Sequence, residues 1–266
     1  MQNNGKETMN KAIGKLFLIP NTLGDISPQD VMSHSVRVAI HTTQHFIFEK
    51  EKVGRAYIKR WCPEKSQNEF DVQILNKHTP QQELLQMLNP CLSGNNIALI
   101  TDAGCPGIAD PGADLVLLAH QSKVSVRPFV GPSSILLALM ASGLNGQQFA
   151  FNGYLPVDRQ MCKQAIKNFE RISSKNNQTQ IFIETPYRNS RCFELLINNL
   201  SPNTYLSVAC DLNLPTEIIQ TKTAKNWKTN GNRKNTCFHK CCAFQLISSG
   251  QQHRYQKSNV CVVCSM

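Results

Sequence analysis

The chain has 266 residues, a formal net charge of +10 and a hydrophobic share of 41%. This length provides for one large or two small globular domains, and the composition excludes an intrinsically disordered chain. No apolar stretch reaches the roughly 18 to 20 residues of a membrane helix, and the polar N-terminus lacks the apolar core of a secretory signal. We therefore expect a cytoplasmic protein without a membrane partner, and the basic surplus favours phosphate-rich partners.

Cysteine spacing separates the end of the chain from the rest. Six cysteines are scattered singly over residues 1–230, which is typical of reduced thiols in a cytosolic enzyme. The tail, residues 231–266, holds the other five, together with five lysines or arginines and no acidic residue. The tail therefore does not continue the pattern that precedes it.

Short apolar runs alternate with amphipathic patterns in the first half of the chain. We predict strands at 15–20, 36–40, 45–48, 96–101 and 124–129. We predict helices at 51–61, at 112–121, and from Pro80 with Thr79 as the N-cap. This alternation predicts a mostly parallel sheet with helices on its faces.

The second half shows a similar alternation after the segment FVGPSS. We predict helices at 133–142, 159–173 and 189–198, and strands at 149–155, 180–184, 205–210 and 216–221. A domain boundary is placed near 129–131. The predicted organisation is an N-terminal α/β domain at 13–129, a C-terminal α/β domain at 130–230 and an atypical tail at 231–266.

The segment Thr101–Gly112, TDAGCPGIADPG, carries the strongest chemical signal. It lies between an apolar strand and a helix, where loops of parallel sheets bind ligands. Gly104 and Gly107 would allow the backbone to approach a ligand closely. The segment is not a dinucleotide fingerprint, because no GxGxxG occurs in it. A tight loop followed by a helix cap explains the same residues without a ligand.

Three further segments have polar groups at the ends of predicted elements. Gly131–Ser134, GPSS, offers amides and hydroxyls at a helix start, although a simple N-cap would look the same. Glu184–Arg188, ETPYR, follows a strand and combines a carboxylate, a phenol and a guanidinium. Asp211 follows the strand YLSVAC in the same way. An ordinary surface loop would explain Glu184–Arg188 and Asp211 equally well.

In chain order, the motifs NTLGD, TDAGCPGIADPG, FVGPSSILLALMASG, FNGYLP and IFIETPYR resemble the tetrapyrrole methylase superfamily. The segment Leu75–Pro80, LNKHTP, is similar to a variant type of its ribosomal RNA methyltransferase branch. The resemblance covers residues 15–228. It implies a two-domain α/β fold with a mostly parallel N-terminal sheet and a mixed C-terminal sheet, a homodimer, and S-adenosylmethionine (SAM) bound in the cleft between the domains.

The resemblance also implies a function, namely methyl transfer from SAM to the ribose 2′-hydroxyl of a cytidine in small-subunit ribosomal RNA. The partners would be ribosomal RNA or the small subunit. Two alternatives stay open: a small-molecule methyltransferase of the tetrapyrrole type, and a protein that binds SAM or RNA without catalysis.

Carried over by motif, the resemblance implies a set of site residues. The cofactor contacts would be Pro20, Asp102, Ala103, Gly104, Ile108, Ala109, Ser133, Ser134, Tyr154, Leu155, Asp211 and Leu212. Glu184 and Asp102 are the candidates for a general base that activates the weakly nucleophilic hydroxyl. Tyr187 and Arg188 would contact the substrate, Arg188 by holding a phosphate bidentately. Arg55, Lys59 and Arg60 would add phosphate contacts, although a solvated helix face explains them equally well.

Two features depart from the family pattern. The variant type shows a tandem arginine where this chain has Arg55–Ala56. Family members also continue past Lys222–Lys228 to a final apolar strand, for which the tail offers no clear equivalent, so we expect that strand to be missing. The tail residues Cys237, His239, Cys241, Cys242, Cys261 and Cys264 are too tightly clustered at their start for a usual zinc site, and no metal is predicted.

Overall fold

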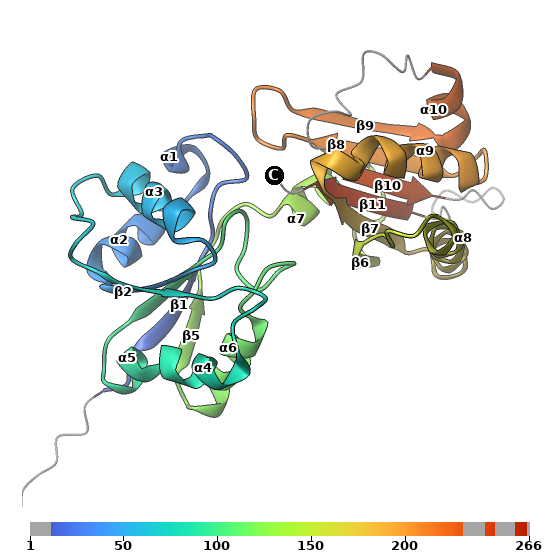
Figure 1. Cartoon of the computed structure of the whole chain (residues 1–266). Coiled ribbons are helices and arrows are strands. Elements are labelled where there is room, and N and C mark those ends of the chain that lie inside the picture. Colours follow the sequence, from blue (N-terminus) through green and yellow to red (C-terminus); the bar gives the residue numbers. More distant parts are fainter. Residues whose placement is uncertain (1–11, 231–242, 248–258, 265–266) are drawn as a thin grey trace, which may run out of the picture. The chain divides into compact units, whose positions relative to one another are not determined.

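The structure is a computed structural model that describes residues 12–230, 243–247 and 259–264. It divides into two compact units (Figure 1). The first unit contains the described residues up to Thr22 together with Ser27–Pro132. The second unit contains Leu23–Ile26 and the described residues from Ser133 onward. Within the part of the chain that the structure describes, each helix is too short or too polar to cross a membrane.

The first unit is built on a parallel sheet. Its elements are β1 (Lys15–Ile19), α1 (Pro28–Val31), α2 (His34–Thr42), β2 (His45–Phe48), α3 (Glu51–Trp61), β3 (Asp71–Ile74), α4 (Gln81–Met87), α5 (Asn89–Leu92), β4 (Ile97–Ile100), α6 (Ala113–Gln121) and β5 (Ser125–Pro128). The strand order is β3-β2-β4-β1-β5, and every neighbouring pair is parallel. The prediction of a parallel N-terminal sheet is confirmed.

Helices cover both faces of this sheet (Figure 1). Phe17 and Ile19 of β1 pack in one buried cluster with residues of α1, α2 and α3. Leu16 of the same strand packs in a second cluster with residues of α4, α5 and α6. The period of two along β1 therefore places successive side chains in separate cores. Because both faces are buried, β4 reads as the uninterrupted apolar run Ile97–Ile100.

The second unit has a mixed sheet. Its elements are α7 (Ser134–Ser142), β6 (Phe149–Tyr154), α8 (Arg159–Asn176), β7 (Thr179–Glu184), the 3₁₀ turn η1 (Pro186–Arg188), α9 (Asn189–Asn199), β8 (Tyr205–Cys210), β9 (Ile218–Thr223), α10 (Ala224–Asn230), β10 (Ala243–Ile247) and β11 (Asn259–Cys264). β6 pairs with β7 in parallel, whereas β8 and β9 are antiparallel. Residues of α8, α9 and α10 share a buried cluster with one face of the sheet, and those of α7 with the other.

The tail supplies backbone to the middle of this sheet. β10 pairs with β7 and β8 in antiparallel fashion, and β11 pairs with the same two strands in parallel. Phe182 of β7 is in register with both Phe244 and Val262. The expectation of a missing strand is therefore wrong.

Most predicted elements are present with bounds that differ by at most three residues, but two predictions need correction. Residues 36–40 form part of α2 and not a strand, because Val36, Ala39 and Ile40 are buried at helical spacing while Val38 is exposed. The N-cap of α4 is Pro80 and not Thr79. Sequence reasoning also missed α1, α5, β3 and α10, which are short or only half-buried.

Candidate functional site

The carboxyl edge of the first sheet brings three loops together. Ile19 of β1 and Phe48 of β2 are both in register with Ile100 of β4, which lies between them. The chain therefore leaves these strands at one edge, where ligands of open α/β sheets bind. The loops begin at Pro20, Glu49 and Thr101.

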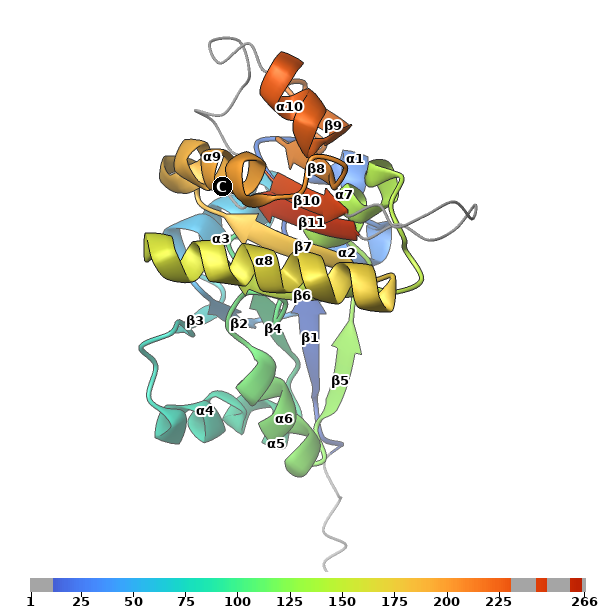
Figure 2. The same ribbon diagram turned by 90° about the vertical axis from the view of Figure 1, so that its right-hand side faces the viewer.

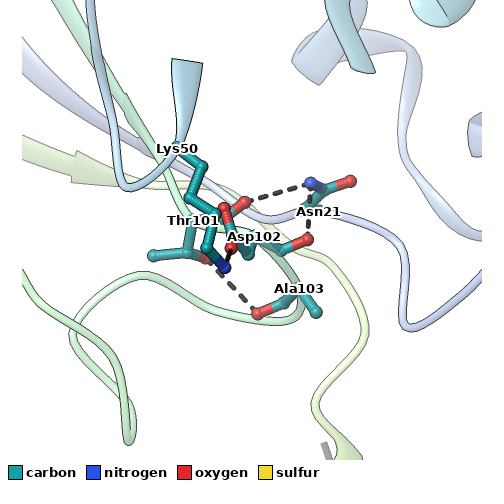
Figure 3. A network of polar contacts seen from close by, with 5 residues as sticks. All are labelled: Asn21, Lys50, Thr101, Asp102 and Ala103. Carbon is teal, nitrogen blue, oxygen red and sulfur yellow. Dashed lines mark hydrogen bonds and ion pairs between the residues drawn. The ribbon is translucent and has the colours of Figure 1, made fainter. Parts of the chain in front are cut away.

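Asn21 fixes the loop that follows β4 (Figure 3). Its amide Nδ2 donates to the carbonyl oxygens of Thr101 and Asp102, both at 3.0 Å. Its backbone forms a bridge to Gly104, with N···O distances of 2.9 and 3.2 Å. Asn21 is itself buried, so these bonds hold the first part of the Thr101–Gly112 loop in one conformation.

Backbone conformation in this loop explains its unusual composition. Gly104 is buried and has φ 70°, a left-handed conformation that glycine adopts without strain. Ala109 has φ 63°, which is strained for a residue with a side chain. Ile108 and Ala109 are both exposed, so the turn presents a small apolar surface and backbone groups to solvent. Strain of this kind often accompanies a binding function.

Charged side chains gather at the same edge. The Lys50 ammonium forms an ion pair with the Asp102 carboxylate, and this contact raises the pKa of Lys50 (Figure 3). Burial raises the pKa of Asp110 to about 7, and the nearby Glu49 and Asp102 carboxylates add to the effect. Burial followed by the Asp102 charge raises the pKa of Glu49. Three carboxylates therefore lie near the Lys50 ammonium at this edge.

The second unit has a different arrangement at the end of β7. Glu184 is fully buried; its Oε1 accepts from the Thr185 amide at 2.8 Å, and its Oε2 lies 3.1 Å from Arg188 Nη2. Burial raises the pKa of Glu184, and the Thr185 bonds and the Arg188 charge oppose this. Arg188 Nη2 also donates to the carbonyl oxygens of Leu155 at 2.8 Å and Pro156 at 3.3 Å. Glu184 and Arg188 thus brace the loop that follows β6.

The remaining predicted residues of the second unit lie at element ends. Ser133 is the N-cap of α7 without a side-chain cap bond, and Ser134 is the first residue of that helix. Tyr154 ends β6 and is half exposed. Asp211 follows β8 with φ 48° and accepts from Thr216 Oγ1 at 2.7 Å, and Leu212 is buried beside α7 residues. Tyr187 of η1 is 84% exposed.

In the first unit, Pro20 is buried, and the backbone at Gly131 passes close to its side chain. A Cβ built on Gly131 would lie 2.4 Å from the Pro20 Cβ, so only glycine fits there. The Pro20 carbonyl accepts from Tyr57 at 2.9 Å. On α3, Arg60 reaches Thr22 Oγ1 at 3.0 Å and Arg55 pairs with Glu51 at 2.7 Å, whereas Lys59 is exposed.

The structure brings together the predicted residues Pro20, Asp102, Ala103 and Gly104 in the first unit, and Leu155, Glu184 and Arg188 in the second. Sequence reasoning missed Asn21, Glu49, Lys50 and Asp110 at the first edge. The sequence does place Glu49 directly after the strand His45–Phe48, but assigning Glu49 to this edge required knowing that β2 lies beside β4.

Among the described residues no group of His, Cys, Asp and Glu could hold a metal ion. Cys237, His239, Cys241 and Cys242 lie outside the described residues.

Comparison with solved structures identifies the fold. The methyltransferase CobJ superposes with a TM-score of 0.57 at 13% identity, covering 92% of this chain and 99% of CobJ. Cobalt precorrin-4 methyltransferase CbiF superposes with a TM-score of 0.50 at 18% identity, covering 83% of this chain and 91% of CbiF. The expected α/β tetrapyrrole methylase fold is confirmed.

Comparison of sequences identifies the family, although no family model matches the chain. The ribosomal RNA small subunit methyltransferase I of Vibrio cholerae is 30% identical over 214 residues, which are 77% of this chain and 67% of that protein. The enzyme of the same name from Escherichia coli O157:H7 is 33% identical over 145 residues, which are 54% of this chain and 49% of that protein. The chain thus spans about half to two thirds of the curated relatives it matches. The chain belongs to the ribosomal RNA small subunit methyltransferase I family of methyltransferases.

Proposed function

We propose that the protein transfers the methyl group of SAM to the ribose 2′-hydroxyl of a cytidine in small-subunit ribosomal RNA. The observation that carries this proposal is the loop after β4, which Asn21 holds at the carboxyl edge of the first sheet. Family membership supplies the reaction class, and the edge supplies a binding site of suitable chemistry.

The groups at this edge fit the cofactor. SAM carries a sulfonium and an ammonium, and the edge has the carboxylates of Glu49, Asp102 and Asp110. Backbone groups near Gly104 and the apolar surface of Ile108 and Ala109 would receive the less polar parts of the molecule. From the second unit, Ser133, Ser134, Tyr154, Leu155, Asp211 and Leu212 remain proposed contacts on the family pattern.

When bound, SAM supplies an electrophilic methyl group, so the residues of the chain have to position an acceptor oxygen and remove its proton. Of the two candidate bases, Asp102 suits this role better. Its side chain is 23% exposed, whereas the Glu184 side chain is 1% exposed and faces Thr185 and Arg188. We assign Asp102 to the acceptor proton and Glu184 to positioning Arg188 and the loop after β6. Lys50 would hold the Asp102 carboxylate in place.

The family and the net charge support the proposed acceptor and the proposed cellular location. The net charge of +10 favours an RNA partner, and the relatives are named for small-subunit ribosomal RNA. With this acceptor, we propose a cytoplasmic location. A homodimer remains part of the proposal, and light scattering of the purified protein tests it directly.

The test of the function uses purified protein, SAM with a labelled methyl group, and small ribosomal subunits or their naked RNA from cells that lack the protein. We expect label in RNA and a 2′-O-methylcytidine by mass spectrometry of RNA fragments. SAM binding without transfer to RNA would support the inactive alternative. Transfer to a tetrapyrrole but not to RNA would support the small-molecule alternative.

A further inference from the structure

A polar groove lies between helices α8 and α9 of the second unit. It has a volume of about 510 Å³. Arg159 and Lys163 of α8 line one side, and Arg191, Glu194 and Asn198 of α9 line the other, with the buried Leu195 between them. Figure 2 shows α8 along its length, and α9 packs beside it.

The charges in this groove are unbalanced. Three cations face one carboxylate, which gives the lining a formal charge of +2. Within the described residues, neither Arg159 nor Lys163 nor Arg191 forms an ion pair with a carboxylate. The positive charge of these three side chains is therefore not neutralised by an ion pair within the described residues.

The placement of these cations opposes helix stability. Arg159, Lys163 and Lys167 follow one another at i, i+4 spacing on α8, where like charges repel. Arg159 is the first residue of α8 and Arg191 lies in the first turn of α9, at the positive ends of the helix dipoles. The Asp158 carboxylate caps α8 by accepting from the Gln160 and Met161 amides, whereas α9 has no side-chain cap bond and no acidic residue in its first turn. A bound anion would relieve the repulsion along α8 and the unfavourable dipole interaction of Arg191 at the start of α9.

We propose that the groove between α8 and α9 binds the phosphodiester backbone of single-stranded RNA. Arg159, Lys163 and Arg191 contact phosphate oxygens, and Asn198 supplies an amide for a ribose hydroxyl or a phosphate. This inference rests on the proposed function, since it places part of the RNA substrate on a surface separate from the acidic edge of the first unit.

The test measures binding of a short fluorescein-labelled single-stranded RNA of small-subunit sequence to the full chain, by anisotropy over a range of salt concentrations. The groove variant carries Arg159→Gln, Lys163→Gln and Arg191→Gln. The matched control carries Lys167→Gln, Arg171→Gln and Lys175→Gln, three exposed cations of α8 outside the groove. Circular dichroism of each variant verifies that α8 and α9 are folded, and methyl transfer is measured on the same samples.

We expect the groove variant to bind RNA at least tenfold more weakly than the native protein. Its plot of log affinity against log salt should be less steep by about 2, as expected when three phosphate contacts to a single strand are lost. The control should bind as the native protein does. Equal RNA affinity of the folded groove variant and the native protein would overturn the inference, and so would competition by polyglutamate as strong as by RNA.

The two proposals fail in different ways. Methyl transfer to RNA with a groove variant of unchanged affinity overturns the groove and leaves the function intact. Groove-dependent RNA binding without any methyl transfer supports the groove and removes the function. Absence of RNA binding by the native protein overturns the groove, and methyl transfer to a tetrapyrrole would then identify the alternative activity.

Discussion

The two units place opposite charges on the surfaces that we assign to ligands. At the carboxyl edge of the first sheet, the carboxylates of Glu49, Asp102 and Asp110 lie near the ammonium of Lys50. In the second unit, the groove between α8 and α9 has three cations and one carboxylate. Both units consist of strands and covering helices, so the fold does not set this difference. The loops and helix faces set it, and they separate a surface suited to a cationic cofactor from one suited to an anionic polymer.

Replacing the carboxylate at the centre of the acidic edge tests its chemical role. Asp102→Asn keeps the size of the side chain and removes the proposed base, so we expect single-turnover methyl transfer at saturating SAM to fall about 100-fold or more. Asp114→Asn, on the exposed start of α6, is the matched control and should stay within about twofold. A near-native rate for Asp102→Asn would remove this residue from the chemistry.

Removing Arg188 tests whether the charges at the end of β7 are structural. Arg188→Ala leaves the buried Glu184 carboxylate without its guanidinium and breaks two bonds to the β6–α8 loop. We expect the second unit to lose about 2 to 4 kcal/mol of unfolding free energy.

Urea denaturation in a Trp61→Phe background measures this loss, because Trp227 then reports on the second unit alone. Glu184→Gln added to Arg188→Ala should restore part of the stability, since no charge stays buried. Exposed Arg191→Ala should change the stability by less than about 0.5 kcal/mol. Equal effects of the two arginine variants would contradict a structural role for Arg188.

Tyr187 tests whether the second unit also uses stacking. Its side chain is 84% exposed, so Tyr187→Ala should not change the unfolding free energy. If the ring stacks on a base, RNA affinity should fall about tenfold, at the lower end of measured base-stacking contributions. Tyr187→Phe keeps the ring and should bind RNA normally. Loss of binding in both variants would point to the hydroxyl and not to stacking.

The pH dependence of the stability of the first unit tests whether burial and the neighbouring carboxylates raise the pKa of Asp110. Since the folded pKa of Asp110 is raised to about 7, the folded state holds this proton longer than the unfolded chain does. This carboxyl therefore lowers the stability progressively as the pH rises from about 4 to about 7, and the loss is complete above that window.

Asp110→Asn should raise the unfolding free energy by about 1 kcal/mol more at pH 8.5 than at pH 4, a value reduced for solvent screening. Denaturation in a Trp227→Phe background, with Trp61 as the reporter, measures it. Exposed Glu83→Gln is the control and should show no such pH dependence. Equal gains for Asp110→Asn at both pH values would show that the group titrates normally.

Local patterns predicted those elements whose burial is regular. The run Ile97–Ile100 and the amphipathic Glu51–Trp61 were identified with nearly correct bounds, because both faces of β4 and one face of α3 are buried. Residues 36–40 were misassigned, because Val36, Val38 and Ile40 alternate as in a strand, whereas the packing of α2 uses Val36, Ala39 and Ile40.

By itself, the sequence determined the family, the α/β alternation and the loop Thr101–Gly112, because these depend on residues that are close together in the chain or on motifs in a fixed order. Only the tertiary structure decided which loops meet. Asn21, Lys50 and Asp102 come together because β1 and β2 flank β4 in register. The cations of α8 and α9 form one groove because both helices pack on the same face of their sheet. Such neighbours are set by strand order and helix packing, which local periodicity does not encode.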